Sequence, residues 1–229
     1  MISSFARPPG FRAGSLLLAA ALVVSACSAA PVGDSTARSS GSAAPSSGSG
    51  GAGACPTSQP APLAKGQQRT VTIETPKGTI TIKVEADLGP NAAGNFVALA
   101  ACGYYNGVVF HRLVPGFVIQ GGDGQFGRTP NVDPNKVGQG GPGYQFADDP
   151  VSVPYTRGTV VMANAGPGTN GSQFFICLAD LAQLPPQYSV FGRVTAGMDV
   201  VDAIAAMPNS GQGNTAVDPV PMTRLTVGN

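Results

Sequence analysis

The sequence predicts a mainly β domain, built as a closed antiparallel barrel with two accessory helices. Three observations support this fold class. Strand-like segments outnumber helical ones, several of them alternate apolar and polar side chains with the period of a half-buried strand, and the strand–helix–strand alternation typical of a parallel sheet does not occur. The predicted folded part, residues 67–229, is long enough to bury one hydrophobic core.

Residues 1–26 have the pattern of a lipoprotein signal peptide. Arg7 and Arg12 precede an apolar stretch that is too short for a transmembrane helix, which needs about 20 residues. The stretch ends in Val24-Ser25-Ala26-Cys27, which resembles the lipobox of bacterial lipoproteins. The resemblance implies cleavage before Cys27 and lipidation of Cys27. The alternative is ordinary cleavage, which would release a free secreted protein.

Residues 27–66 are predicted to form a flexible tether. They consist mostly of Ser, Gly, Ala and Pro, and such a segment cannot offset its ordering entropy by burying apolar surface. The whole chain carries 13 basic and 12 acidic residues, and the leader contains two of the bases and no acid. A near-neutral mature chain gives no electrostatic case for nucleic-acid binding.

The chain has four cysteines. If Cys27 is lipidated, three remain in a compartment where disulfides persist, so at most one internal pair can form. Cys177 lies within a predicted strand and reads as a buried small hydrophobe. Cys55 and Cys102 are the better placed pair. Three titratable thiols in the non-reduced protein would exclude that bridge, and the sequence leaves the question open.

The domain begins with a predicted β-hairpin and a helix. Residues 69–75 and 78–84 alternate apolar and polar side chains and flank a Pro-Lys-Gly turn. Residues 90–101 predict a helix, because Pro90 stands at its first turn and Gly103 follows its end. The remaining predicted elements are a strand pair around Arg112 with its turn at Pro115-Gly116, strands at 158–163, 172–178 and 189–194, a helix at 197–207 and a closing strand at 222–227.

The stretch from Phe110 to Asp123 is the most informative part of the chain. Arg112 and Gln120 are embedded among strand-forming apolar residues, and a guanidinium there must be paired or must face water or a ligand. His111, the single histidine, is expected on the opposite face of the strand from Arg112. A structural role for His111 is therefore favoured over that of a general base.

A second informative stretch runs from Met162 to Ile176. Asn164 and Gln173 contribute amides, and the adjacent Phe174 and Phe175 must face opposite sides of a strand. Together with the first stretch, these residues predict an apolar pocket ringed by a few hydrogen-bonding groups, which is typical of a small-ligand site. The intervening residues 121–149 are rich in Gly, Pro, Asn and Asp and predict a long functional loop. Its two G-x-G-x-x-G matches do not open a helix, so they do not indicate dinucleotide binding.

At these two stretches the chain resembles the cyclophilin-type peptidyl-prolyl cis-trans isomerases. The motifs Phe-His-Arg-x-x-Pro-Gly-Phe-x-x-Gln-Gly-Gly-Asp and Met-Ala-Asn-Ala-Gly-Pro-x-Thr-Asn-Gly-Ser-Gln-Phe-Phe-Ile occur without an internal gap. The resemblance covers residues 68–229 and implies an eight-stranded antiparallel β-barrel capped by two helices, with a proline groove on its outer face.

The resemblance also implies roles for individual residues. Arg112 looks like the catalytic arginine. Phe117, Phe175 and Leu184 look like the walls of the proline pocket, and the groups that hold the substrate backbone look like Gln120, Ala163, Asn164 and Gln173. Gln183 stands where the best-known eukaryotic members carry a Trp, which weakens the case for tight cyclosporin binding. Tyr188 stands where they carry a pocket His, and it can still line the groove.

The implied reaction needs no nucleophile, metal or cofactor, because rotation about an X-Pro bond breaks no covalent bond. Conjugation of the amide sets a barrier of about 18–20 kcal/mol. The enzyme has only to favour the twisted amide, in which the proline nitrogen regains a lone pair that Arg112 can hydrogen-bond. A rate acceleration of about a million-fold would require roughly 8 kcal/mol of differential stabilisation.

We therefore expect a monomeric prolyl isomerase that acts on proline-containing exported polypeptides outside the cytoplasmic membrane, where a lipid on Cys27 anchors it. The alternative is a proline-peptide binding module or holdase in which turnover is incidental. Arg112 favours the enzyme, because a pure binder has no need of a donor aimed at the imide nitrogen. A hydrolase that uses His111 is the third and least favoured reading.

Overall fold

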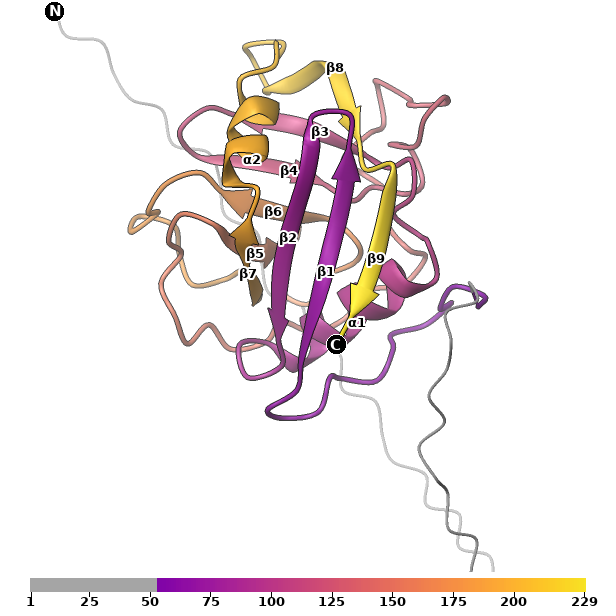
Figure 1. Cartoon of the computed structure of the whole chain (residues 1–229), viewed down its shortest axis with the longest axis vertical. Helices are drawn as coiled ribbons and strands as arrows, with labels where there is room; N and C mark the ends of the chain where they lie inside the picture. The colour runs from indigo at the N-terminus through magenta and orange to yellow at the C-terminus, as the bar shows by residue number, and fades with distance from the viewer. Residues whose placement is uncertain (1–52) are drawn as a thin grey trace, which may run out of the picture. The chain divides into compact units, whose positions relative to one another are not determined.

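The computed structural model describes residues 53–229 (Figure 1). The predicted signal peptide, Cys27 and the first part of the predicted tether lie outside the described residues. Within residues 53–229, no helix has the length and apolar character needed to cross a membrane.

A single antiparallel sheet forms most of the domain. Its order is β8-β3-β4-β6-β5-β7-β2-β1-β9, and every neighbouring pair is antiparallel. The nine strands are β1 (Gln68–Thr75), β2 (Gly78–Glu85), β3 (Val109–Val114), β4 (Val118–Gly121), β5 (Thr159–Met162), β6 (Phe174–Cys177), β7 (Val190–Ala196), β8 (Thr215–Pro221) and β9 (Arg224–Gly228). The predicted mainly β, antiparallel fold class is confirmed.

The C-terminal segment joins the two ends of the curled sheet. β8 pairs with β3 at one end of the order, and β9 pairs with β1 at the other (Figure 1). Between them, the Met222 amide donates to the Val108 carbonyl and the Thr223 amide donates to the Glu74 carbonyl, each at 2.8 Å. The sequence predicted one closing strand here. The structure has two, so the strand count is nine rather than eight.

The two predicted helices are present as α1 (Pro90–Ala101) and α2 (Met198–Ala205). Helix α1 contacts β1, β2, β7 and β9, whereas α2 contacts β2, β3 and β4. The first turn of α1 is capped by a residue that is far away along the sequence. The Asp149 carboxylate accepts the Asn91 amide at 3.2 Å and the Ala92 amide at 2.8 Å. Helix α2 is shorter than predicted. It begins after Gly197, which has a φ of +85°, and it ends before Pro208.

The sheet separates two apolar clusters. The inner cluster contains Phe174, whose ring centroid lies 5.2 Å from that of Phe96 on α1. The outer cluster is built on β4, β5, β6 and β7 and contains Phe175. The adjacent phenylalanines therefore face opposite sides, as strand alternation predicts. The outer cluster provides the apolar floor of the candidate site.

Residues 55–66, which we call the strap, lie along α1 rather than forming the end of a free tether. A disulfide joins Cys55 to Cys102 at the end of α1, and the Leu63 amide donates to the Pro90 carbonyl at 3.0 Å. A Cβ on Gly94 would collide with the Ala61 carbonyl oxygen, so the helix needs glycine at this contact. The packed domain thus extends to Cys55, beyond the boundary that composition predicts at residue 67. Main-chain hydrogen bonds and a disulfide hold the strap where large apolar side chains are scarce.

Candidate functional site

Arg112 and Gln120 lie opposite each other on β3 and β4. Their register pairs Arg112 with Gln120, and it pairs Gln120 with Phe175 on β6. The Arg112 Nη1 donates to Gln120 Oε1 at 3.4 Å. Within residues 53–229 no carboxylate forms a salt bridge with the half-buried Arg112. Its guanidinium therefore keeps most of its N–H groups for a ligand or solvent.

A row of side-chain amides continues from Gln120. The Gln120 Nε2 donates to Gln173 Oε1 at 3.0 Å, and the Gln173 Nε2 donates to the carbonyl oxygens of Gly138 and Gly140 at 2.9 Å each. We call this series, from Arg112 through Gln120 and Gln173 to the two glycines, the amide relay. Both N–H groups of Gln173 are used within the protein.

The predicted walls of the proline pocket come together beside Arg112. Phe117, Leu184 and Tyr188 are partly exposed and pack on the outer cluster, to which the buried Phe175 belongs. The Phe175 and Tyr188 ring centroids lie 5.7 Å apart, with the ring planes at 80°. This edge-to-face pair gives the apolar surface a fixed shape next to a cationic donor.

Ala163 and Asn164 directly follow β5 and lie next to Gln173 of the amide relay. The Ala163 amide donates to the Gln173 carbonyl at 2.9 Å. The Asn164 Nδ2 donates to Asp148 Oδ1 at 3.1 Å and to the Gln187 carbonyl at 2.9 Å. The resemblance implied that Asn164 is one of the groups that hold the substrate backbone. The structure uses both of its side-chain N–H groups internally, and the side-chain oxygen accepts the Gly166 amide at 3.3 Å, so the Asn164 side chain is held mainly by contacts within the protein.

A cavity of about 780 Å³ adjoins these groups. Its lining includes Gln120, Ala163, Asn164 and Gln173 together with residues 138–145. The predicted long loop between residues 121 and 149 therefore forms a wall of this cavity, next to the amide relay that leads to Arg112.

Two residues that the sequence analysis missed hold this site together. The Tyr155 hydroxyl donates to the Tyr188 carbonyl and accepts the Tyr188 amide, both at 3.0 Å, which fixes the loop that carries Leu184. Burial raises the pKa of Tyr155 and keeps it protonated. On α1, Asn95 donates to the Gly171 carbonyl and accepts the Tyr144 hydroxyl, both at 2.8 Å. In the sequence, Tyr155 stands out only as a single aromatic residue within a loop that contains Pro and Val.

His111 lies at a β-bulge, so strand alternation alone does not decide which way it faces. The register of β3 shifts between Phe110 and Arg112, and a Cβ on Gly138 would lie 3.4 Å from His111 Nε2. The ring is 5% exposed, and neither ring nitrogen has a hydrogen-bond partner among residues 53–229. His111 therefore holds no nucleophile in place, and the hydrolase reading gains no support. Burial lowers the pKa of His111 from 6.5 to about 4.

We expect the protein to lose stability as the pH falls from about 6.5 towards 4. Between these values His111 binds a proton in the unfolded chain but not in the folded protein. The neutral, buried ring therefore contributes to the free energy of unfolding in full above pH 6.5, and this contribution is lost as the pH falls towards 4. The pH-dependent part of the free energy of unfolding that is due to His111 amounts to about 3 kcal/mol. Urea unfolding across this range measures the slope, and His111→Gln should remove most of it. Because the chain has one histidine, its ring proton signal gives the pKa directly, and titration near 6.5 would contradict the prediction.

The part of the chain that the structure describes contains no cluster of three or more His, Cys, Asp or Glu side chains able to hold a metal ion. Cys177 is a buried free thiol, and burial raises its pKa to about 12. It therefore remains a neutral, unreactive part of the outer cluster at physiological pH.

Comparison with known proteins gives consistent matches. The family model described as cyclophilin type peptidyl-prolyl cis-trans isomerase/CLD matches residues 70–227. The probable peptidyl-prolyl cis-trans isomerase A of Mycobacterium leprae is 37% identical over 183 residues, covering 70% of this chain and 93% of the relative. Peptidyl-prolyl cis-trans isomerase B of Streptomyces anulatus is also 37% identical over 183 residues, covering 70% of this chain and 97% of the relative.

Solved structures agree with these matches. A crystal structure of a cyclophilin type peptidyl-prolyl cis-trans isomerase from Cryptosporidium parvum superposes with a TM-score of 0.62 at 32% identity, covering 71% of this chain and 99% of that protein. A second structure of the same parasite protein, determined in the presence of the dipeptide Ala-Pro, gives a TM-score of 0.60 at 32% identity, with 70% and 99% coverage.

Proposed function

This chain belongs to the cyclophilin-type peptidyl-prolyl cis-trans isomerases, and from that premise we propose that it isomerises X-Pro bonds in exported proteins, outside the cytoplasmic membrane, as a lipoprotein anchored through Cys27. The observation that carries the catalytic part is the half-buried Arg112, which has no carboxylate partner among residues 53–229 and lies beside the apolar surface around Phe175.

The proposed mechanism is stabilisation of the twisted imide. The apolar side chains Phe117, Phe175 and Leu184 hold the proline ring, so that rotation is confined to the preceding carbonyl. As conjugation is lost, the proline nitrogen becomes a hydrogen-bond acceptor, and the Arg112 guanidinium donates to it. Planar cis and trans amides lack this acceptor, so the interaction lowers the barrier rather than stabilising either ground state.

Proline-containing peptides are the proposed substrate class. The Cryptosporidium parvum relative was crystallised in the presence of Ala-Pro, which supports this substrate class. This chain has the apolar surface around Phe175 and the guanidinium donor of Arg112 that such a substrate needs. Exported polypeptides are the clients that the predicted location would supply.

The sequence and the disulfide support the location. The sequence has two arginines, then a short apolar stretch and then Cys27, which is the order typical of a lipoprotein leader. The Cys55–Cys102 disulfide fits an oxidising compartment outside the cytoplasm, where such bonds persist.

Fractionation of producing cells tests this proposal in one experiment. We expect labelled palmitate and prolyl isomerase activity, measured by the refolding of an added exported protein, to occur together in the membrane fraction. Cys27→Ala should lose the label and move the activity out of that fraction, because the lipid is the only proposed anchor. Ser28→Ala, which keeps the cysteine, should behave like the wild type. An unlabelled wild-type protein would refute the anchor, and binding of the client without faster refolding would favour a holdase.

A further inference from the structure

Asp123 is a buried carboxylate that the mechanism above does not use. It is fully buried, and among residues 53–229 it forms no salt bridge with Lys or Arg. Its Oδ1 accepts the amides of Gln125 and Phe126 at 3.0 and 2.9 Å, and its Oδ2 accepts those of Gly138 and Gly140 at 2.8 and 3.0 Å. Charge-assisted bonds of this kind are the stronger class of hydrogen bond. A single side chain thus ties together both ends of the loop 124–140.

The same two glycines end the amide relay. Their amides donate to Asp123, and their carbonyl oxygens accept both N–H groups of Gln173. With its nitrogen held in this way, Gln173 presents its oxygen to Gln120, and Gln120 presents its own oxygen to Arg112. The orientation of every amide in the relay therefore depends on where the glycine carbonyls stand.

We propose that Asp123 is a positioning residue for the isomerase reaction: it holds the Gly138 and Gly140 carbonyls so that Gln173 and Gln120 orient the Arg112 guanidinium towards the imide nitrogen. The inference rests on the proposed catalytic role of Arg112. Asp123 touches no substrate in this arrangement and acts only through the relay.

Close packing at Gly140 agrees with this role. A Cβ on Gly140 would collide with Asp123 Oδ1 and would lie 2.7 Å from the Gln125 Cβ. Glycine is thus required for the loop to approach the carboxylate closely enough for its amide to bond there. Gly140→Ala disturbs the contact between the loop and Asp123 from the loop side, without altering a charge, so it tests the relay while the Asp123 carboxylate is kept.

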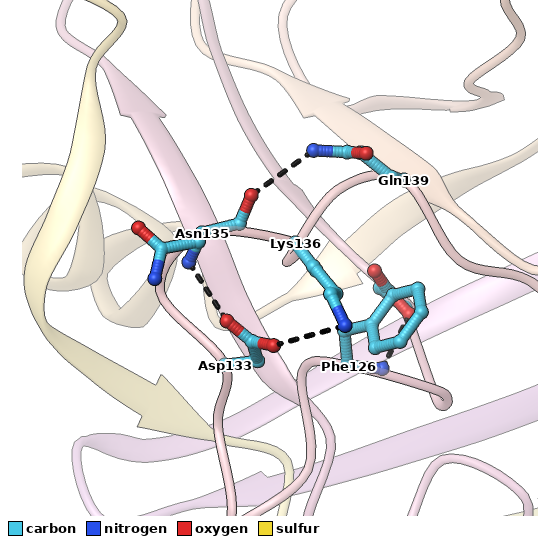
Figure 2. Close-up of polar contacts among 6 residues, drawn as sticks. Phe126, Asp133, Asn135, Lys136 and Gln139 are labelled. Atoms are coloured by element: carbon cyan, nitrogen blue, oxygen red, sulfur yellow. Dashed lines mark hydrogen bonds and ion pairs between the residues drawn. The ribbon is translucent and has the colours of Figure 1, made fainter.

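The outer part of the loop is held by separate contacts and provides a matched control. Figure 2 shows Lys136 between the Asp133 carboxylate, with its Nζ 3.9 Å from Oδ2, and the ring of Phe126. Asn135 donates its amide to Asp133 Oδ1 at 2.9 Å, and Gln139 Nε2 donates to the Asn135 carbonyl at 3.1 Å (Figure 2). These contacts are exposed, and an exposed ion pair contributes little. Lys136→Ala should therefore leave the relay and the activity unchanged.

The test is a double-mutant cycle with Ala-Pro peptide exchange as the assay. Asp123→Asn leaves a single side-chain oxygen, so one pair of loop amides loses its acceptor. We expect Asp123→Asn and Gly140→Ala each to lower kcat about tenfold to a hundredfold with a smaller change in KM, because they misplace Arg112 and leave intact the apolar surface that binds the proline ring. In an Arg112→Ala background the same substitutions should change kcat less than about twofold, since the group they position is gone.

The outcomes separate the two proposals. Equal losses in both backgrounds would show a general structural role for Asp123 and would overturn this inference while leaving Arg112 in place. Normal kcat in Gly140→Ala would overturn it as well, and this variant covers the case in which Asp123→Asn fails to fold. Wild-type kcat in Arg112→Ala alone would refute the catalytic proposal itself, and this inference with it.

Discussion

Arg112→Ala should lower kcat for a proline peptide about a hundred- to a thousandfold, the usual effect of removing one donor that acts on the transition state. Peptide affinity should change little. The proline ring binds the apolar surface of Phe117, Phe175 and Leu184, and the substitution leaves that surface intact. The imide nitrogen of a planar peptide offers no acceptor, so Arg112 gains its partner only as the bond twists. NMR exchange spectroscopy gives the rate, and calorimetric titration with the same peptide gives Kd.

Two further substitutions sharpen this result. Arg112→Lys keeps the charge but loses the planar fork that can donate to Gln120 and the imide together, so its kcat should be intermediate. Arg69→Ala removes a half-buried arginine on β1, away from the candidate site, and should leave kcat and Kd unchanged. If Kd weakens as much as kcat falls, Arg112 binds the ground state and the twisted-imide mechanism is wrong.

Loss of the Cys55–Cys102 disulfide should have the largest effect on stability. The bridge spans 47 residues of sequence, and closing a loop of that length stabilises a fold by about 3–4 kcal/mol, mainly by restricting the unfolded chain. For a domain of this size, Cys55→Ser should therefore lower Tm by about 10 °C. The variant also frees the start of the strap from the end of α1. Calorimetry and urea unfolding without reductant measure the change.

Reductant provides the internal control for this prediction. A thiol reductant should lower the Tm of the wild-type protein to that of Cys55→Ser and should leave the variant itself unchanged. Cys177 is already reduced and buried, so it contributes to neither state. A Cys55→Ser variant as stable as the non-reduced wild type would show that the strap is held by its main-chain contacts alone.

Local patterns predicted the regular elements closely. The hairpin β1–β2 and helix α1 fall where alternation, a turn and a helix-starting proline place them. Strand β8 was missed because Pro219 and Pro221 interrupt its pattern, and its pairing with β3 is long-range. The strap was assigned to the tether for a similar reason. Its composition offers little burial, whereas its partners on α1 lie 27 or more residues away along the chain.

The sequence by itself determined the family, the two motifs and the residue types around the groove, because spacing within a motif is a local property of the chain. Only the tertiary structure decided what each polar group does. Gln120 and Gln173 are separated by 53 residues, and Asp123 and Gly140 by 17, yet each pair is joined by a hydrogen bond. The sequence shows which side chains can donate or accept, whereas their partners depend on how the curled sheet and the loop 124–140 bring distant segments together.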